Sequence, residues 1–201
     1  MADRRTIETY NSAAEELSEY FKGIGPRIAY IELALKEANA KNNASVVEIG
    51  CGDGRDASEI VKRVGSYIGF DPSTELLERA RKKVPRGVFI EAEAITFDYP
   101  DNLDVVYAFA SLLHSPKDEV KQVCRKVLAA LKPGGIFYIS LKEDTNYNST
   151  VQRDRFGERL FYYYNVPLFI ELTGPQFEKV YEDHLLIGHT RWFELALRKK
   201  G

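Results

Sequence analysis

Cysteine and histidine are scarce in this sequence, and long apolar runs are missing. Only Cys51 and Cys124 are present, together with three histidines, so the chain has neither a disulfide framework nor a zinc-ligand spacing, and no metal is expected. No apolar stretch approaches the ~20 residues that cross a bilayer. The arginines near the N-terminus are followed by no apolar segment of the kind found in a secretory signal. These absences predict a cytoplasmic protein with no membrane contact.

Charge of one sign is not in excess either. The chain has 28 Lys and Arg against 30 Asp and Glu, a net charge of −2, and this gives no global attraction to nucleic acid. Its 201 residues, 44% of them hydrophobic, are enough for one domain with a sizeable core. A small-molecule partner is therefore favoured over nucleic acid, and the oligomeric state is left between monomer and homodimer.

Apolar periodicity predicts helices and strands in alternation over most of the chain. Helices are expected at 6–21, 26–40, 54–63, 73–83 and 116–131, and strands at 45–50, 66–71, 87–92, 103–110 and 135–141. Such alternation is typical of an α/β, Rossmann-like, mostly parallel sheet with helices on both faces. Residues 142–159 are polar without a clear period and predict a functional or mobile loop. The segments 177–183 and 191–199 alternate as antiparallel edge strands do.

The stretch "VVEIGCGDGRDA" (46–57) has glycine at Gly50, Gly52 and Gly54, directly after the most strand-like segment. In an open α/β sheet, ligands bind outside the carboxyl ends of the strands. Glycine at that place permits positive φ and lets the backbone approach a ligand closely. A plain strand-to-helix turn usually needs only one glycine. The loop is therefore predicted to bind a ligand.

The kind of ligand is indicated by the loop spacing and by two acids. The glycines follow G-x-G-x-G and not the G-x-G-x-x-G of dinucleotide folds, and Asp53 lies inside the loop, where it would repel a phosphate. The second strand ends in Asp71, a suitable place for a carboxylate that accepts both ribose hydroxyls. The alternative for Asp71 is a helix N-cap, although Ser73 can fill that role. A nucleoside without phosphates, carrying a charged amino-acid tail, meets these conditions.

Five segments, taken in order, resemble the motifs of the class I S-adenosylmethionine-dependent methyltransferases, and the chain looks like the small stand-alone members of their type 11/12 group. The segments are "VVEIGCGDG", "GFDPS", "EAEA" at 91–94, "LDVVYAFASLLH" and "LKPGGIFYIS". The resemblance implies a seven-stranded sheet in the order 3-2-1-4-5-7-6 with the last strand antiparallel. It also implies one methyltransferase domain: an N-terminal helical cap (1–43), a cofactor-binding core (44–141) and a substrate-side segment with the final strand pair (142–201).

The resemblance further implies a set of residues around S-adenosylmethionine, which becomes S-adenosylhomocysteine after transfer. The implied set is Glu48, Gly50, Cys51, Gly52, Gly54, Arg55, Asp71, Pro72, Ser73, Glu93, Ala94 and Ala108. Asp71 would hold the ribose, Glu93 the adenine amino group, and the Ala108 carbonyl the ammonium group. Arg55 has two interpretations, a pair with the methionine carboxylate or a pair with Asp56 or Glu59. Cys51 is interpreted as structural, because transfer from a sulfonium needs no nucleophile.

Candidate substrate-side residues follow the fourth strand. His114 in "ASLLHSP" is the best candidate for a general base, because an imidazole titrates near ~6.5; a capping or packing histidine is the alternative. Tyr162 and Tyr163 in "RLFYYYNVPLF" predict an aromatic pocket or lid, or else a core beside a helix at 166–173. Arg191 begins the last strand, within reach of the cleft.

The sequence thus predicts an S-adenosylmethionine-dependent methyltransferase that acts on an unidentified small molecule. One alternative is methylation of tRNA or protein, although no basic tail or added nucleic-acid module is visible. The other is a protein that binds S-adenosylmethionine without transfer. In either enzymatic case, the helix at 6–21 and the segment 142–165 are expected to close over the cofactor as a lid.

Overall fold

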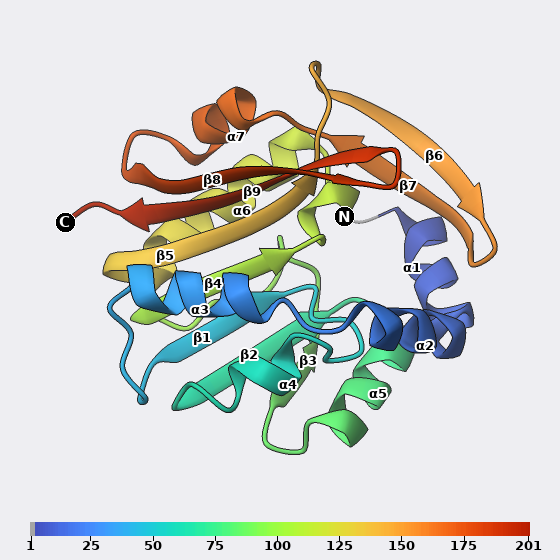
Figure 1. Ribbon diagram of the computed structural model, residues 1–201, viewed down its shortest axis with the longest axis horizontal. Coiled ribbons are helices and arrows are strands. Elements are labelled where there is room, and N and C mark those ends of the chain that lie inside the picture. The colour runs from blue at the N-terminus through green and yellow to red at the C-terminus, as the bar shows by residue number, and fades with distance from the viewer. Residues whose placement is uncertain (1–2) are drawn as a thin grey trace.

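A seven-stranded sheet forms the centre of the computed structural model, which describes residues 3–201 (Figure 1). Its strands are β1 (Ser45–Ile49), β2 (Ser66–Asp71), β3 (Val88–Glu91), β4 (Leu103–Phe109), β5 (Leu131–Lys142), β8 (Phe177–Ile187) and β9 (Thr190–Lys199). They run in the order β3-β2-β1-β4-β5-β9-β8. The first five are parallel, and β9 is antiparallel to both of its neighbours. The expected order and the antiparallel last strand are confirmed.

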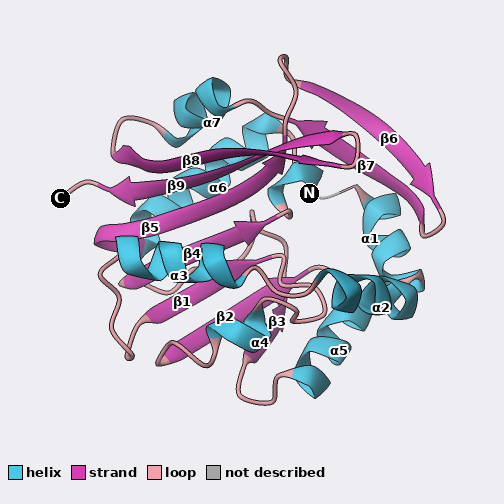
Figure 2. Cartoon of the chain, in the orientation of Figure 1, coloured by secondary structure: helices cyan, strands magenta, loops and turns pink. Residues whose placement is uncertain are grey.

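Helices cover both faces of this sheet (Figure 2). The helices are α1 (Arg4–Ser12), α2 (Ala14–Ile24), α3 (Ile28–Glu37), α4 (Ala57–Ile60), α5 (Thr74–Lys83), α6 (Lys117–Ala130) and α7 (Val166–Thr173), with a short 3₁₀ turn at Leu112–His114. Side chains of α3, α4 and α5 pack on one face and those of α6 and α7 on the other. No helix within residues 3–201 is long and apolar enough to cross a membrane.

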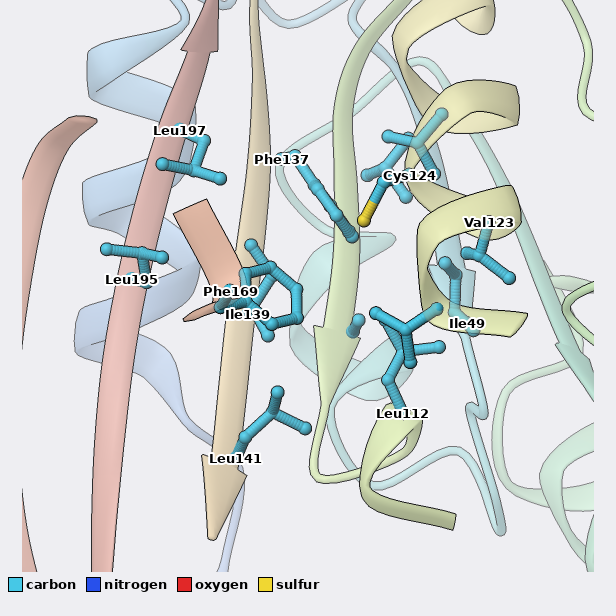
Figure 3. Close-up of a cluster of buried hydrophobic side chains, with 14 of the residues drawn as sticks. Ile49, Leu112, Val123, Cys124, Phe137, Ile139, Leu141, Phe169, Leu195 and Leu197 are labelled. Atoms are coloured by element: carbon cyan, nitrogen blue, oxygen red, sulfur yellow. The ribbon is translucent and has the colours of Figure 1, made fainter. Parts of the chain in front are cut away.

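The core lies on both faces of β4 and β5, because these central strands are buried on both sides. Figure 3 shows the side of the sheet where Cys124 of α6 and Phe169 of α7 meet Phe137 and Ile139 of β5. Each of these side chains is fully or almost fully buried. Each Å² of apolar surface removed from water stabilises the fold by roughly 25 cal/mol. This core therefore holds the carboxyl ends of the strands in fixed positions.

The N-terminal helix differs from its expected extent. The apolar face over 6–21 predicts one helix, but the structure breaks it into α1 and α2 at Ala13, which has φ −103 and caps both. Asp3 caps α1 through its side chain, which accepts hydrogen bonds from the N–H groups of Arg5 and Thr6. Because of the break, α1 leaves the direction of α2 and packs against a different part of the molecule.

The polar segment that follows β5 is also ordered, so the expected loop over 142–159 is wrong. It forms an antiparallel hairpin of β6 (Asn148–Asp154) and β7 (Gly157–Tyr163), separate from the main sheet. The sequence of β6 shows no apolar period of two, because its residues are polar on both faces except for the exposed Val151. Helix α1 lies against β7, as Figure 1 shows. The two segments of the expected lid, the N-terminal helix and the segment 142–165, are therefore in contact.

Candidate functional site

The glycine loop follows β1 at the carboxyl edge of the sheet, as predicted. Gly50, Gly52 and Gly54 all have positive φ, at 68°, 52° and 77°. A Cβ on Gly50 would lie 2.3 Å from the Cβ of Ser111, so only glycine fits beside the end of β4. A Cβ on Gly52 would instead meet only Leu76, at 4.0 Å, which leaves that side of the loop backbone accessible.

Asp71 at the end of β2 is bonded to this loop. One carboxylate oxygen accepts a hydrogen bond from the N–H of Gly52 at 2.9 Å, and the other accepts from the N–H of Ser73 at 2.9 Å. Burial raises the pKa of Asp71 to about 6, although both backbone bonds oppose the shift. Each oxygen keeps a second lone pair, so the carboxylate can still accept from the two hydroxyls of a ribose. Ser73, and not Asp71, caps α5 by accepting from Leu76 N–H.

A groove of about 470 Å³ continues from Asp71 along the ends of β2 and β3. Its walls come from these strand ends and from α1; the lining residues are Arg4, Ile7, Glu8, Pro72, Glu91, Ala92, Glu93 and Thr96. Two of the residues expected to flank adenine, Pro72 and Glu93, therefore line one hollow, and Ala94 follows in the chain. The part played by α1 could not be predicted from the motif.

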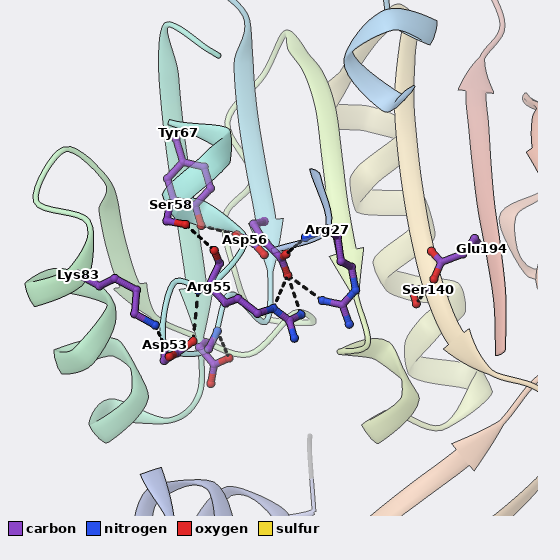
Figure 4. A network of polar contacts seen from close by, with 12 residues as sticks. Arg27, Asp53, Arg55, Asp56, Ser58, Tyr67, Lys83, Ser140 and Glu194 are labelled. Carbon is purple, nitrogen blue, oxygen red and sulfur yellow. Dashed lines mark hydrogen bonds and ion pairs between the residues drawn. The ribbon is translucent and has the colours of Figure 1, made fainter. Parts of the chain in front are cut away.

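A buried network of acids and arginines lies behind the glycine loop (Figure 4). Asp56 pairs with Arg27 at 2.7 Å and with Arg55 at 2.8 Å. Glu48 of β1 is buried and accepts a hydrogen bond from Tyr67 Oη at 2.5 Å. Burial, reinforced by the charge of Asp56, raises the pKa of Glu48 well above its ordinary value. The network ties α3 and α4 to the loop.

Three predictions about the loop can be compared with this geometry. Arg55 makes the ion pair of its second interpretation, with Asp56, and its guanidinium lies over the Phe21 ring; its pairing with the methionine carboxylate stays a prediction. Cys51 is buried, and burial raises the pKa of its thiol well above the ordinary value, as suits a structural residue. Asp53 is 1% exposed and pairs with Lys83 of α5. The expectation that Asp53 repels a ligand phosphate is therefore wrong, since its charge is neutralised away from the groove.

The chain turns at the end of β4, two residues after Ala108, whose carbonyl is expected to bind the ammonium group. Ala108 is fully buried and registers with Ile139 of β5. The turn comes at Ala110, a non-glycine residue with φ 51, whose N–H donates to Ser140 O at 3.0 Å. Ser111 then packs against Gly50. A side chain held in the left-handed region is strained, and such strain clusters at functional sites.

His114 follows this turn and uses both ring nitrogens. Its Nδ1 lies 2.7 Å from Leu160 O, so Nδ1 carries the proton, and its Nε2 accepts from Tyr10 Oη at 2.9 Å. Burial lowers the pKa of His114 to about 4, so the ring is neutral at pH 7. The tyrosine comes from α1, and no motif in the sequence predicts this pairing.

Helix α1 bonds to both sides of the site. Asn11 accepts from Ser73 Oγ at 2.7 Å on the side of the groove. Thr6 accepts from Leu160 N at 2.9 Å and Thr9 donates to Glu158 O at 2.7 Å, both on β7. These side-chain bonds join α1, β7 and the end of β2 across the carboxyl edge of the sheet.

The predicted substrate-side residues separate in the structure. Tyr163 faces inward, where its hydroxyl accepts from Gln152 Nε2 at 2.6 Å, and its ring centre lies 5.8 Å from Lys142 Nζ. Tyr162 stacks on Tyr147 at 6.1 Å on the other face of the hairpin. Arg191 is exposed and pairs with Glu143. The structure thus brings Tyr163 near Lys142 but not the other two.

Comparison with known proteins agrees with this arrangement. Residues 46–135 match the family described as methyltransferase domains. A sterol 24-C-methyltransferase of Aspergillus fumigatus is 33% identical over 132 residues, which are 60% of this chain and 34% of the relative. A trans-aconitate 2-methyltransferase of Rhodopseudomonas palustris is 34% identical over 101 residues, 49% of this chain and 39% of the relative. The chain therefore spans well under half the length of these curated relatives.

Solved structures share the fold over most of the chain. The Burkholderia thailandensis 1,6-didemethyltoxoflavin-N1-methyltransferase, with 1,6-didemethyltoxoflavin and S-adenosylhomocysteine bound, superposes with a TM-score of 0.73 at 18% identity, covering 97% of this chain and 87% of that one. A methyltransferase of Methanosarcina mazei gives a TM-score of 0.71 at 18% identity, covering 80% and 94%. Residues 46–135 of this chain therefore resemble a methyltransferase domain, and the chain as a whole has the fold of these solved structures.

Proposed function

We propose that the protein binds S-adenosylmethionine and transfers its methyl group to a small-molecule acceptor. The observation that carries the proposal is the pairing of Gly52 with Asp71. This pairing places a glycine with an open side and a ribose-binding carboxylate at the same edge of the sheet. The groove beside Pro72 and Glu93 continues from this point and gives the adenine a place.

The residues at this edge fit the cofactor. Asp71 accepts the ribose hydroxyls, and Gly50 and Gly52 let the loop backbone lie against the methionine portion. Glu48 and Asp56 hold the loop from behind, through the hydrogen bond from Tyr67 and the ion pair with Arg27. When bound, the cofactor supplies an electrophilic methyl group: the acceptor bonds to its carbon, the S–CH₃ bond breaks, and that electron pair stays on sulfur.

Besides binding the cofactor, the protein must exclude water from the reaction. Helix α1 and the β6–β7 hairpin can do this together. Thr6, Thr9 and Asn11 connect α1 to both sides of the site. Such a cover aligns the acceptor and keeps water from the sulfonium. We therefore propose that α1 and the hairpin open for exchange and close for transfer.

The acceptor is proposed to be a small molecule for two reasons. The matched relatives are named for sterol and trans-aconitate, and the structural neighbour for a toxoflavin precursor. The second reason is that α1 bonds both to Ser73 and to β7 across the carboxyl edge of the sheet, which favours an acceptor small enough to fit beneath them. His114 Nε2 remains the proposed proton acceptor for acceptors that must lose a proton, once Tyr10 Oη has moved away. We also propose a cytoplasmic location, supported by two cysteines that are both buried and free.

Calorimetry followed by a labelled transfer assay tests the proposal. Purified protein should bind S-adenosylhomocysteine, and methyl-labelled S-adenosylmethionine with a metabolite extract should yield a labelled small product. Binding without any product would favour the non-catalytic alternative. A labelled product in the RNA or protein fraction alone would instead favour the macromolecular one.

A further inference from the structure

Five side chains under the β6–β7 hairpin form what we call the inner-face cluster: Lys142, Gln152, Arg159, Phe161 and Tyr163. Arg159, Phe161 and Tyr163 are alternate residues of β7, so their side chains share one face of the hairpin. Gln152 of β6 is the partner of Arg159 in the strand register. Lys142 ends β5 at the carboxyl edge of the sheet. Its Nζ lies 3.4 Å from the centre of the Phe161 ring and 2.9 Å from Gln152 Oε1.

This cluster adjoins the groove side of the site. The Phe161 ring centre lies 4.8 Å from that of His114, which in turn bonds to Tyr10 of α1. The same helix reaches Ser73 beside Asp71 through Asn11. The cluster and the proposed cofactor site are therefore two ends of one covered edge, and an acceptor beside the methyl group would meet the cluster.

The two cations of the cluster have too few partners. Lys142 is 9% exposed, and within residues 3–201 no carboxylate oxygen lies within 4.0 Å of its Nζ. The side chain of Arg159 is 12% exposed; it pairs with Asp154 at the hairpin turn, while its buried Nε has no hydrogen-bond partner in the described chain. Burial and the neighbouring Arg159 lower the pKa of Lys142 to about 8, a sign of this imbalance.

The neutral neighbours do not offset this charge. Burial keeps His114 uncharged by lowering its pKa to about 4, and burial raises the pKa of Tyr163. Among residues 3–201, Asp154 is thus the acid that acts on both cations. A buried cation is costly unless an opposite charge pairs with it, and one carboxylate shared between two cations leaves room for a second one from a ligand.

We propose that the methyl acceptor is a small organic acid whose carboxylate is bound by Lys142 and by Arg159, the two residues that set substrate specificity. This inference rests on the proposed function and narrows its substrate class. The ammonium donates to one oxygen and the guanidinium Nε to the other, in place of the contacts that Lys142 now makes with Phe161 and Gln152. The rings of Phe161 and Tyr163 pack against the organic part.

The test measures binding to protein saturated with S-adenosylhomocysteine. Calorimetry compares benzoate, 4-hydroxybenzoate and trans-aconitate with their neutral amides, and includes phenyl phosphate. We expect at least one acid to bind and its amide to bind at least tenfold more weakly. Lys142→Met and Arg159→Gln should each weaken that acid roughly tenfold to hundredfold, the usual loss for a charge-assisted hydrogen bond. Arg153→Gln is the matched control, because this arginine lies on the same hairpin and is 82% exposed.

The outcomes separate the two proposals. Failure of the wild-type protein to bind S-adenosylhomocysteine would remove the proposed function itself. If S-adenosylhomocysteine binds equally well to all variants but no acid binds, or amides bind as well as acids, the acid-binding inference is wrong. Binding of phenyl phosphate alone would also contradict it. Lys142→Met removes a buried charge and keeps most of the length of the side chain, and denaturant unfolding of each variant checks that it is folded.

Discussion

The sharpest consequence of the glycine-loop geometry concerns Gly52→Ala. Alanine at φ 52 adopts the left-handed conformation, which costs roughly 1–2 kcal/mol of stability. Its Cβ meets no protein atom closer than Leu76 at 4.0 Å, so no clash adds to this cost. If the cofactor lies against this side of the loop, however, the same methyl group overlaps it. Overpacking of that kind costs roughly 1–3 kcal/mol, or about 5- to 150-fold in affinity.

Gly134→Ala provides the matched control. Gly134 has φ 81 and nothing within 4 Å of its Cβ position, and it lies near the start of β5, at the other edge of the sheet. Denaturant unfolding should show similar losses of stability in both variants. Calorimetry with S-adenosylhomocysteine should show lost affinity only in Gly52→Ala. Wild-type affinity in Gly52→Ala would refute the placement of the cofactor, and equal losses in both variants would assign the effect to stability.

Three further predictions follow from buried ionisable groups. Asp71→Asn should weaken the binding of S-adenosylhomocysteine by roughly 1–3 kcal/mol in calorimetry. The affinity of the wild-type protein should fall as pH drops through about 6, since the protonated acid accepts fewer hydrogen bonds. An affinity that stays constant from pH 5 to 8 would count against this role of Asp71. Glu194, which accepts from Ser140 Oγ at 2.7 Å, has a pKa that burial raises to about 7. The folded state therefore keeps on Glu194 a proton that the unfolded state, with a pKa of about 4.5, has released. The free energy of unfolding falls as pH rises from about 4.5 to about 7. Glu194→Gln should gain roughly 3 kcal/mol relative to wild type between pH 5 and 8 in unfolding titrations, and a constant difference would contradict the assignment. Binding of acids should weaken above about pH 8 as Lys142 loses its proton, with Arg159, Asp154, His114 and Tyr163 facing it; a kcat/KM that rises there would point instead to a lysine base.

Local pattern was enough to predict the main sheet. Strands such as "SVVEIG" and "SYIGFD" are short apolar runs, which the sequence shows directly. The loop at Gly50–Gly54 predicts a ligand site, because the strand, the turn and the helix that form it are adjacent in sequence. The order of the strands came from the resemblance that these motifs carry. The groove residues Pro72 and Glu93 followed from the same motifs.

The cover of the site could not be read in this way. Thr6 meets Leu160 across 154 positions of sequence. The bond from Tyr10 to His114 depends on the break at Ala13, where no glycine or proline marks a helix end. Polar residues on β6 concealed the hairpin, and with it the environment of Lys142. The ion pair of Asp53 could not be predicted because its partner, Lys83, lies at the end of α5, beyond the helix that follows the loop.

The central claim is that the glycine loop and Asp71 hold S-adenosylmethionine, and a pair of calorimetric titrations tests it most directly. One titration adds S-adenosylhomocysteine to the wild-type chain and the other adds NAD under the same conditions. Tight one-to-one binding of S-adenosylhomocysteine, lost in Gly52→Ala and retained in Gly134→Ala, with negligible heat from NAD, is the predicted result. NAD binding at least as tightly as S-adenosylhomocysteine would contradict the account.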